Sequence, residues 1–515
     1  MKRSILSAVM ILLSGFAFAQ QKQGNELPAN WYNLDLKANG VFGISIDKSY
    51  SELLKGKKPV SVIVAVIDGG IDPKHEDLKN VVWTNPKEIP GNGKDDDKNG
   101  YIDDIHGWNF LGSSKDDFEY DNDLIVVEVR KGKAKFGDKD STAIAKKDLP
   151  AYREYIAKRE DLKGRLENAN QKIESTNTFL TDVNALQKKL AKDQPTLEDF
   201  KNYVPSTDAE AKAQQFMVRI LQKNPSYKAY MEQTKEQLEE YQHDAQYHLN
   251  INYDPRAKYA NEFTAAKGRF YGNGNVYGAV PPAHGTHVAG VIAAQRNNNI
   301  GINGVADAVQ LMAIRAIPDG YGLDKDEANA IRYAADNGAK VINMSFGLST
   351  AIDKKMVEDA VKYALSKDIL FIQAAGNGHD NLDLNTGYPD RKNPADQDFT
   401  DAFIKVGASG ISDDEHLAVP FSNFGKRSVD VFAPGLGINS TIPGNHYEAH
   451  SGTSMAAPVV AGMAAVIREY YPKLTAKQVK EIIMKTVIKR DTLKELCISG
   501  GVVNAYDALK LAATY

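Results

Sequence analysis

Three polar residues that together could carry out acyl transfer lie in three separate segments of the sequence. Asp68 lies in VIVAVIDGGID, His284 in AHGTHVAGVIAA and Ser454 in SGTSMAAPVVAG. A serine hydroxyl becomes a nucleophile when a neighbouring histidine removes its proton, and a carboxylate keeps that histidine in the required tautomer. These residue types therefore predict attack on a carbonyl group, with Ser454 as nucleophile, His284 as general base and Asp68 as its orienting carboxylate.

Ser454 and His284 could instead have structural or metal-binding roles. Ser454 precedes a run of small apolar residues and could cap a buried helix, because serine oxygens accept hydrogen bonds from the first helical N–H groups. His284 and His287 could form a metal pair, but the segment lacks the His-Glu-x-x-His pattern of zinc peptidases. We therefore predict that His287 packs inside a helix. The order of the residues excludes an α/β-hydrolase, whose histidine follows the serine, because the sequence has no histidine after His450.

The three segments resemble the signatures of the subtilisin-like serine peptidases, and VINMSFG and AAGN between them strengthen the resemblance. The order Asp, His, Ser is the order of that family. The resemblance implies an active serine endopeptidase that acts on polypeptides through an acyl-enzyme. The rival hypothesis is a catalytically silent binding protein with a helical working surface. Only a missing catalytic residue would favour this rival from the sequence, and none is missing.

The resemblance also implies how substrate is bound. Asn377 would donate its side-chain amide to the oxyanion, together with the backbone N–H of Ser454. One segment would pair with the substrate backbone as an added strand, and a second would line the pocket for the residue before the scissile bond. The implied residues are Ser345, Phe346 and Gly347 in the first segment, and Ala374, Ala375 and Gly376 with Gly387 as floor in the second. Their small size implies broad specificity with a preference for large apolar side chains.

The resemblance further implies a structural calcium site. The segment NNNIGINGVA is similar to the family's high-affinity calcium loop, although it is one residue longer. Asn298 would supply a side-chain ligand, Ile300 and Ile302 would supply carbonyl groups, and Asp77 would complete the site.

A second calcium site is suggested by the residues of DDDKNGYIDD themselves. Acidic and amide side chains alternate there as in the first part of an EF-hand loop, with a glycine at the turn. The candidate ligands are Asp95, Asp97, Asn99 and Asp103. Position twelve of this loop is His106, where an EF-hand has a bidentate glutamate. The alternative is a solvated acidic turn.

The elements that must position these residues follow from the apolar patterns. Continuous apolar runs predict buried strands at 61–68, 311–317, 339–346, 369–377 and 428–435. Amphipathic patterns at 324–338, 353–367 and 475–487 predict helices between or after them. This alternation predicts a doubly wound, mainly parallel α/β sheet with a large helical insertion. Ligands bind beyond the carboxyl ends of such strands, where Asp68 and Asn377 are expected.

Shifts in composition predict the domain boundaries. Residues 1–19 have the basic start, apolar run and small residues of a secretory signal peptide, so we expect export to the periplasm or out of the cell. The catalytic domain is expected at 40–85 and 270–515. Residues 86–139 are expected to form an acidic loop region. Residues 140–265 are rich in charge and carry long amphipathic stripes, which predict a helical hairpin or bundle.

The overall composition limits the partners. The 515-residue chain has a formal net charge of −4, which gives no reason to expect nucleic acid or an anionic membrane as partner. No segment after the signal peptide is long and apolar enough to span a membrane. The single cysteine, Cys497, excludes an internal disulfide, so we expect bound calcium to supply rigidity. We expect no organic cofactor, and the sequence leaves the oligomeric state open.

Overall fold

The computed structural model describes residues 28–223, 226–259, 268–347, 353–385, 388 and 401–515. Two predictions, the signal peptide at 1–19 and the pocket floor at Gly387, lie outside the described residues. None of the described helices combines the length and the apolar character that crossing a membrane requires.

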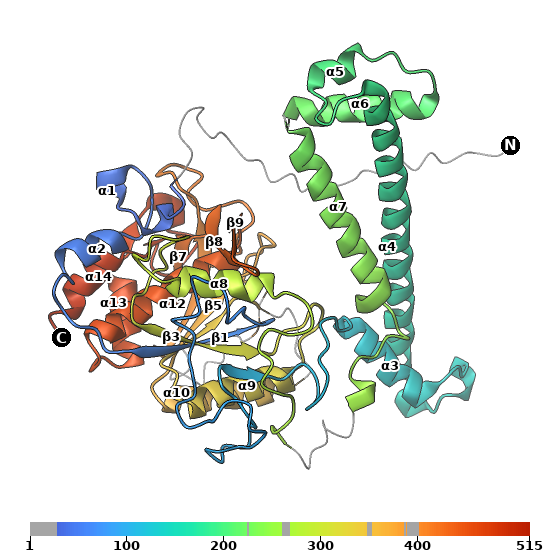
Figure 1. The fold of residues 1–515 in the computed structure, drawn as a ribbon. Helices are drawn as coiled ribbons and strands as arrows, with labels where there is room; N and C mark the ends of the chain where they lie inside the picture. The colour runs from blue at the N-terminus through green and yellow to red at the C-terminus, as the bar shows by residue number, and fades with distance from the viewer. Residues whose placement is uncertain (1–27, 224–225, 260–267, 348–352, 386–387, 389–400) are drawn as a thin grey trace.

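A nine-stranded sheet forms the centre of the catalytic domain (Figure 1), with strand order β10-β11-β7-β6-β5-β4-β1-β3-β2. All neighbouring pairs are parallel except β10 and β11. The strands are β1 (Val62–Asp68), β2 (Gly107–Asn109), β3 (Val309–Arg315), β4 (Val341–Met344), β5 (Leu370–Ala374), β6 (Phe403–Ser409), β7 (Val431–Pro434), β10 (Ile488–Lys489) and β11 (Gly501–Val502). A separate antiparallel hairpin is formed by β8 (Ile438–Ile442) and β9 (His446–His450).

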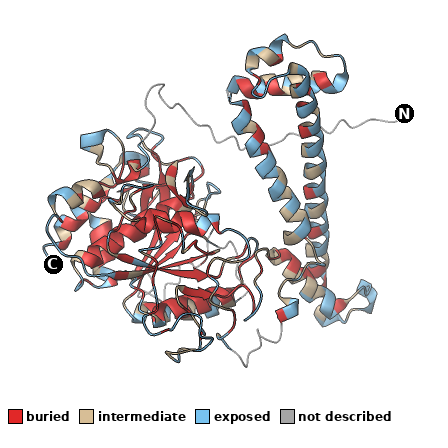
Figure 2. Ribbon diagram, in the orientation of Figure 1, coloured by how far each residue is buried: buried red, intermediate tan, exposed pale blue. Residues whose placement is uncertain are grey.

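Helices cover both faces of this sheet, so the predicted doubly wound α/β fold is confirmed. Alternate residues of β1 enter two different cores: Val64 and Val66 pack in one, and Ala65 and Ile67 pack in the other. On the first face lie α8 (Ala283–Ala293), α12 (Thr453–Tyr470), α13 (Ala476–Lys485) and α14 (Ala505–Ala512), and on the second lie α9 (Asp324–Asp336) and α10 (Lys354–Ser366). Figure 2 shows that buried residues concentrate in the sheet and in these helices. Two short N-terminal helices, α1 (Leu36–Asn39) and α2 (Ile46–Glu52), precede β1.

A long helical arm projects from this domain (Figure 1). Its helices are α3 (Leu124–Phe136), α4 (Leu149–Leu190), α5 (Leu197–Asn202), α6 (Asp208–Lys223) and α7 (Tyr227–His243), followed by a π-helical turn at Asp244–His248. The 42 residues of α4 give it a length of about 63 Å. The arm, residues 124–248, has two cores of its own: Val126, Val129 and Phe136 belong to the one near the base, and Val183 and Phe200 to the one near the tip.

The predicted boundary between an acidic loop region at 86–139 and a helical insertion at 140–265 is wrong. Residues 107–109 of the supposed loop region form β2, the edge strand of the main sheet, and α3 belongs to the arm. A three-residue strand leaves no periodic pattern in a sequence. The helix was missed because Lys and Gly in its second half hide the apolar stripe formed by Ile125, Val126 and Val129.

Candidate active site

Asp68 and His284 lie within hydrogen-bonding distance of each other. Asp68 is the last residue of β1 and is almost completely buried, whereas His284 is the second residue of α8 and has a half-exposed side chain. The His284 Nδ1 atom lies 2.9 Å from Oδ1 and 3.0 Å from Oδ2 of Asp68. Burial lowers the pKa of His284, but the charge and hydrogen bond of Asp68 outweigh it, so the pKa is raised overall. The carboxylate thus fixes the ring and stabilises its protonated form.

The close approach of α8 to the end of β1 depends on Gly285. A Cβ atom at this position would lie 2.0 Å from the carbonyl oxygen of Gly70 and 3.0 Å from Oδ1 of Asp68. Any side chain would therefore push His284 away from Asp68. His287, one turn further along α8, is fully buried, stacks on the ring of His450 at 4.4 Å and lies 3.0 Å from the carbonyl oxygen of Ile438. This is the packing role that the sequence predicts for it.

Ser454 is the second residue of α12, as His284 is of α8, and the two helices pack against each other. The N-cap residue of α12 is Gly452, so the alternative of Ser454 as a helix cap is wrong. Its hydroxyl donates to the carbonyl of Ser345 at 2.8 Å, and the hydroxyl of Ser345 donates to the carbonyl of Ser454 at the same distance. These reciprocal bonds hold the start of α12 against the segment that follows β4.

Asn377 presents its side-chain oxygen to Thr453, the first residue of α12. Its Oδ1 atom accepts hydrogen bonds from the backbone N–H and from the hydroxyl of Thr453, both at 2.9 Å. The Nδ2 atom therefore faces the opposite way. A Cβ atom built on Gly452 would lie 3.4 Å from Asn377 Nδ2 and 3.6 Å from the backbone nitrogen of Ser454. Two N–H donors thus flank one point beside Gly452, which is the arrangement an oxyanion hole requires.

The two segments predicted to contact substrate lie opposite each other. A Cβ atom on Gly347 would lie 3.8 Å from the carbonyl oxygen of Ala374. Ser345 and Ala375 are buried, whereas Phe346 is partly exposed and Gly347 is exposed. The side chain of Asn423 stabilises the second segment, residues 374–376, and the turn after it. It donates to the carbonyl of Ala375 at 2.9 Å and accepts hydrogen bonds from the N–H groups of Gly378 and Asp380.

A further segment beside Asp68, which sequence reasoning missed, connects the site to the arm. Ala316 and Ile317, directly after β3, donate their N–H groups to the carbonyl of Asp68. The next residues pair with the chain that enters the arm: Asp319 N–H donates to the Glu119 carbonyl at 2.9 Å, and Asp121 N–H donates to the Asp319 carbonyl at 2.8 Å. We call residues 119–122 the root segment.

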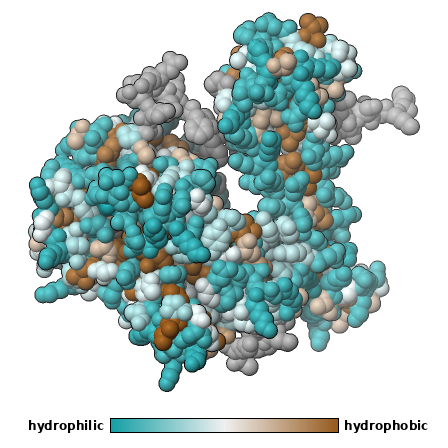
Figure 3. All heavy atoms as spheres, viewed as in Figure 1, coloured by the Kyte–Doolittle hydropathy of each residue, from teal (hydrophilic) through white to brown (hydrophobic). Residues whose placement is uncertain are grey.

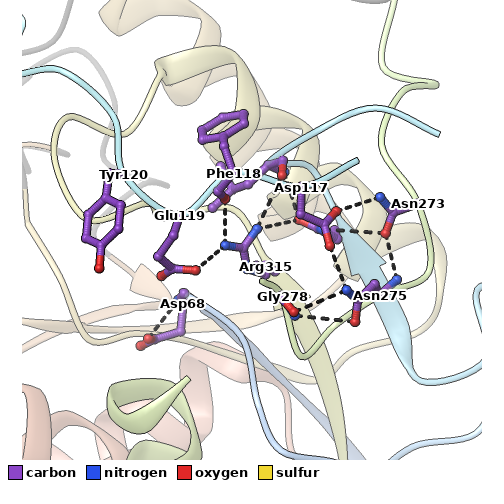
Figure 4. Close-up of polar contacts among 12 residues, drawn as sticks. Asp68, Asp117, Phe118, Glu119, Tyr120, Asn273, Asn275, Gly278 and Arg315 are labelled. Carbon is purple, nitrogen blue, oxygen red and sulfur yellow. Dashed lines mark hydrogen bonds and ion pairs between the residues drawn. The ribbon is translucent and has the colours of Figure 1, made fainter. Parts of the chain in front are cut away.

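Arg315, the last residue of β3 and fully buried, holds the root segment in place. Its Nη2 atom donates to the carbonyl of Phe118 at 2.7 Å and to Glu119 Oε2 at 2.5 Å. Figure 4 shows these contacts with Asp68 beside them, and Asp117 linked to Asn273. An arginine inside the otherwise apolar run LMAIRAI is the sequence signal that could have revealed this anchor.

Two residues of the first predicted calcium site, Asn298 and Ile302, contact Asp77. This carboxylate is fully buried and accepts hydrogen bonds from Asn298 Nδ2 at 2.6 Å and from the Ile302 N–H at 3.1 Å. Ile300 lies at the exposed tip of the loop. Burial raises the pKa of Asp77, and no Lys or Arg pairs with it among the described residues. Both oxygens of Asp77 thus accept N–H groups, and the Asn298 side-chain oxygen accepts the Ile300 N–H at 3.1 Å. A calcium ion here would require Asn298 to turn its oxygen toward Asp77.

The second predicted calcium loop is arranged differently from the prediction. Asp95, Asp97 and Asn99 lie together, but Asp103 does not join them. Both oxygens of Asp103 accept hydrogen bonds from the backbone N–H groups of residues 91–93. The structure does not bring Asp103 into the group of converging carboxylates that contains Asp95 and Asp97, which contradicts its prediction as a fellow ligand.

Comparison with known proteins places this site in a family context. The model of the subtilase family matches residues 60–500. The thermophilic serine proteinase of Bacillus sp. (strain AK1) is 44% identical over 185 residues, which cover 36% of this chain and 42% of that protein. Subtilisin BL of Lederbergia lenta is 33% identical over 228 residues, which cover 44% of this chain and 77% of that protein.

Among solved structures, a protease from Pseudoalteromonas arctica PAMC 21717 is 31% identical and has a TM-score of 0.38; the match covers 46% of this chain and 73% of that one. The chain spans 42% and 55% of the lengths of the Bacillus sp. (strain AK1) proteinase and of alkaline elastase YaB of Bacillus sp. (strain YaB).

Proposed function

The chain belongs to the subtilase family, and from that premise we propose that it is a serine endopeptidase that hydrolyses peptide bonds through an acyl-enzyme. The observation that carries the proposal is the pairing of His284 with Asp68 at the start of α8, a helix that packs against the helix that carries Ser454. Two N–H donors lie near one point beside Gly452, close to Ser454.

The proposed reaction uses these groups in sequence. His284 takes the proton of the Ser454 hydroxyl as the oxygen attacks the substrate carbonyl carbon, and the carbonyl oxygen becomes an anion between Asn377 Nδ2 and the Ser454 N–H. Asp68 stabilises the imidazolium that has formed. His284 then gives its proton to the leaving amine, which releases the first product. Water repeats the attack on the acyl-enzyme, with His284 again as base, and releases the second product.

The substrate is a polypeptide bound in an extended conformation. Its backbone lies along residues 345–347 as an added strand, and the side chain before the scissile bond lies between this segment and residues 374–376. The Ala and Gly residues there leave room for a large apolar side chain, so the expected specificity is broad.

Two further parts of the proposal concern the setting of the enzyme. The signal-peptide pattern of residues 1–19 supports export, with the mature enzyme either periplasmic or secreted. The buried Asp77 carboxylate next to Asn298 supports a structural calcium ion, which would stabilise the folded state because the unfolded chain lacks this arrangement.

Replacing Ser454 by Ala tests the proposed function. We expect casein hydrolysis to fall on the order of a millionfold, the size of loss associated with removing the nucleophile of a subtilisin. A fluorophosphonate probe should label the parent enzyme and fail to label the variant. Equal hydrolysis by both proteins would refute the mechanism, and an inactive parent that is folded would favour the silent binding protein.

A further inference from the structure

Three carboxylates converge in the loop that follows the first strand. Glu88, Asp95 and Asp97 each place one oxygen within 4.8 Å of the other two. Asp95 and Asp97 belong to the segment with the EF-hand-like pattern, whereas Glu88 comes from the preceding turn. Like charges at this spacing repel one another unless protons or a cation neutralise them. None of the three is paired with Lys, Arg or His within the part of the chain that the structure describes.

The burial of Glu88 is not expected if the loop is only a solvated acidic turn. Its side chain is only 7% exposed. The Oε1 atom accepts hydrogen bonds from the N–H groups of Asp96 at 2.9 Å and Asp97 at 3.1 Å. The Oε2 atom is buried and has no hydrogen-bond partner. Burying a carboxylate oxygen without a partner is unfavourable, so this atom indicates a missing positive ligand.

The backbone of the loop is already shaped for a cation. Asp95 accepts hydrogen bonds from the N–H groups of Asn99 and Gly100, and Gly100 has a φ of +97°, which glycine adopts without strain. An aspartate at position one and a glycine at position six are features of EF-hand loops. The twelfth position, His106, instead lies 2.9 Å from the carbonyl oxygen of Trp83.

We propose that Glu88, Asp95 and Asp97 bind a calcium ion, with Glu88 supplying from upstream the carboxylate that the EF-hand pattern lacks downstream. Three carboxylates without nitrogen or sulfur ligands favour a hard divalent cation. This site is separate from the one around Asp77, and it does not depend on the proposed peptidase activity.

Bound calcium at this site stabilises the connection between the catalytic domain and the arm. Tyr101, within the loop, is buried and packs edge-on against Trp108 in β2 at 4.9 Å and Tyr333 in α9 at 4.9 Å. The loop therefore sets the position of β2, and β2 leads directly into the chain held by Arg315.

Calcium titration calorimetry on the full chain tests the proposal. Each variant carries Ser454→Ala to prevent self-digestion, is freed of metal with a chelator, and is then titrated with calcium chloride. We expect Glu88→Gln to bind one calcium ion fewer than its parent and to gain less in thermal midpoint on calcium addition. Asp96→Asn is the matched control, because it removes the same charge from the same loop but lies outside the carboxylate group.

The outcomes separate the two calcium sites. Asp77→Asn should leave the Glu88 site intact, so the double variant should lose more calcium than either single one. The proposal is overturned if Glu88→Gln binds as many ions as its parent, or if Asp96→Asn loses calcium equally. Should Glu88→Gln fail to fold, Asp97→Asn is titrated in its place with the same expectation and the same criteria.

Discussion

At the scale of single residues, Thr453 decides which way the amide of Asn377 is turned. Its backbone N–H and its hydroxyl both donate to Asn377 Oδ1, and its Oγ1 accepts the N–H of Gly376 at 3.0 Å. A flipped Asn377 would place an oxygen where the developing oxyanion needs a donor. Thr453 is thus a positioning residue next to the nucleophile.

This role predicts a particular pattern in mutant kinetics. Asn377→Ala should lower kcat by roughly a hundred- to a thousandfold with KM nearly unchanged, because its amide meets charge that exists only in the transition state. Thr453→Val should lower kcat about tenfold, the equivalent of one hydrogen bond, and Thr453→Ser should restore it. In the Asn377→Ala background, Thr453→Val should have no further effect on kcat. A loss confined to KM, or full additivity, would contradict the positioning role.

The residues of the site divide into those that the sequence could predict and those that it could not. Asp68, His284, Ser454 and Asn377 lie in motifs with their own chemical signature. Thr453 lies in the quoted SGTS segment, but its two hydrogen bonds to Asn377 join residues that are distant in the sequence. The carboxylate of Glu88 was missed because Glu88 lies outside the EF-hand-like pattern, although its side chain joins those of Asp95 and Asp97.

At the scale of elements, β6 is the longest of the strands that sequence analysis missed. Lys405 interrupts its apolar run, although this lysine is only 4% exposed in the structure. Asp430 joins this strand to α13, because its carboxylate accepts the backbone N–H of Lys405 at 2.9 Å and pairs with Lys480 Nζ at 2.9 Å. The apolar pattern identifies strands whose residues are apolar throughout, and it misses a strand that a lysine interrupts.

In the π-helical turn at the base of the arm, His248 lies between two carboxylates, an arrangement that we call the histidine clamp. His248 Nδ1 lies 3.0 Å from Asp244 in the same turn, and Nε2 lies 3.3 Å from Asp319, which pairs with the root segment. Burial lowers the pKa of His248, but these carboxylates, aided by Asp123, raise it to about 10 overall. The protonated ring therefore links the arm to the segment beside Asp68.

This clamp predicts a pH-dependent contribution to stability. The folded pKa lies above the ordinary value of about 6.5, so the contribution is fully present below pH 6.5 and is lost as the pH rises through about 10. We expect His248→Gln to lower the free energy of unfolding by about 1–3 kcal/mol at pH 6, allowing for screening of the half-exposed carboxylates, and to have little effect above pH 10. Denaturant unfolding in the Ser454→Ala background measures this, with the exposed His416→Gln as control. An effect that is constant with pH would argue against the clamp.

At the scale of the whole molecule, the arm and the catalytic domain have separate hydrophobic cores. They are joined beside Asp68. The apolar stripes of α4 pack into the arm's own two cores. Figure 3 shows a largely hydrophilic arm surface, with the upper part standing clear of the catalytic domain in this view. The carboxyl ends of β1 and β3 face the side on which the arm stands (Figure 1), so the arm lies on the side where Asp68 ends β1.

The two ends of the arm meet at its base, which makes a clean deletion feasible. Asp123 N–H donates to the carbonyl of His248 at 2.8 Å, and Asn122 Nδ2 donates to the carbonyl of Tyr247 at 2.7 Å. A short Gly/Ser bridge can therefore replace residues 124–249, while the bonds of Arg315 to Phe118 and Glu119 still hold the start of the root segment. Because the arm's cores are its own, we expect the trimmed enzyme to fold and to keep its activity on short peptides.

We predict that the trimmed enzyme gains activity selectively on folded proteins. The chain that enters the arm pairs with the segment bonded to Asp68, so removing the arm should admit bulkier substrates. The measurement is the ratio of kcat/KM for a folded protein to that for a short peptide, in the parent and the trimmed enzyme. An unchanged ratio would leave the arm a tolerated surface insertion, which costs little free energy because loop-closure entropy grows slowly with length. Failure to fold would assign the arm to folding instead. The matched control replaces only the tip helices α5 and α6 with a short Gly/Ser linker. This change shortens the arm at its tip and leaves the hydrogen bonds at its base in place.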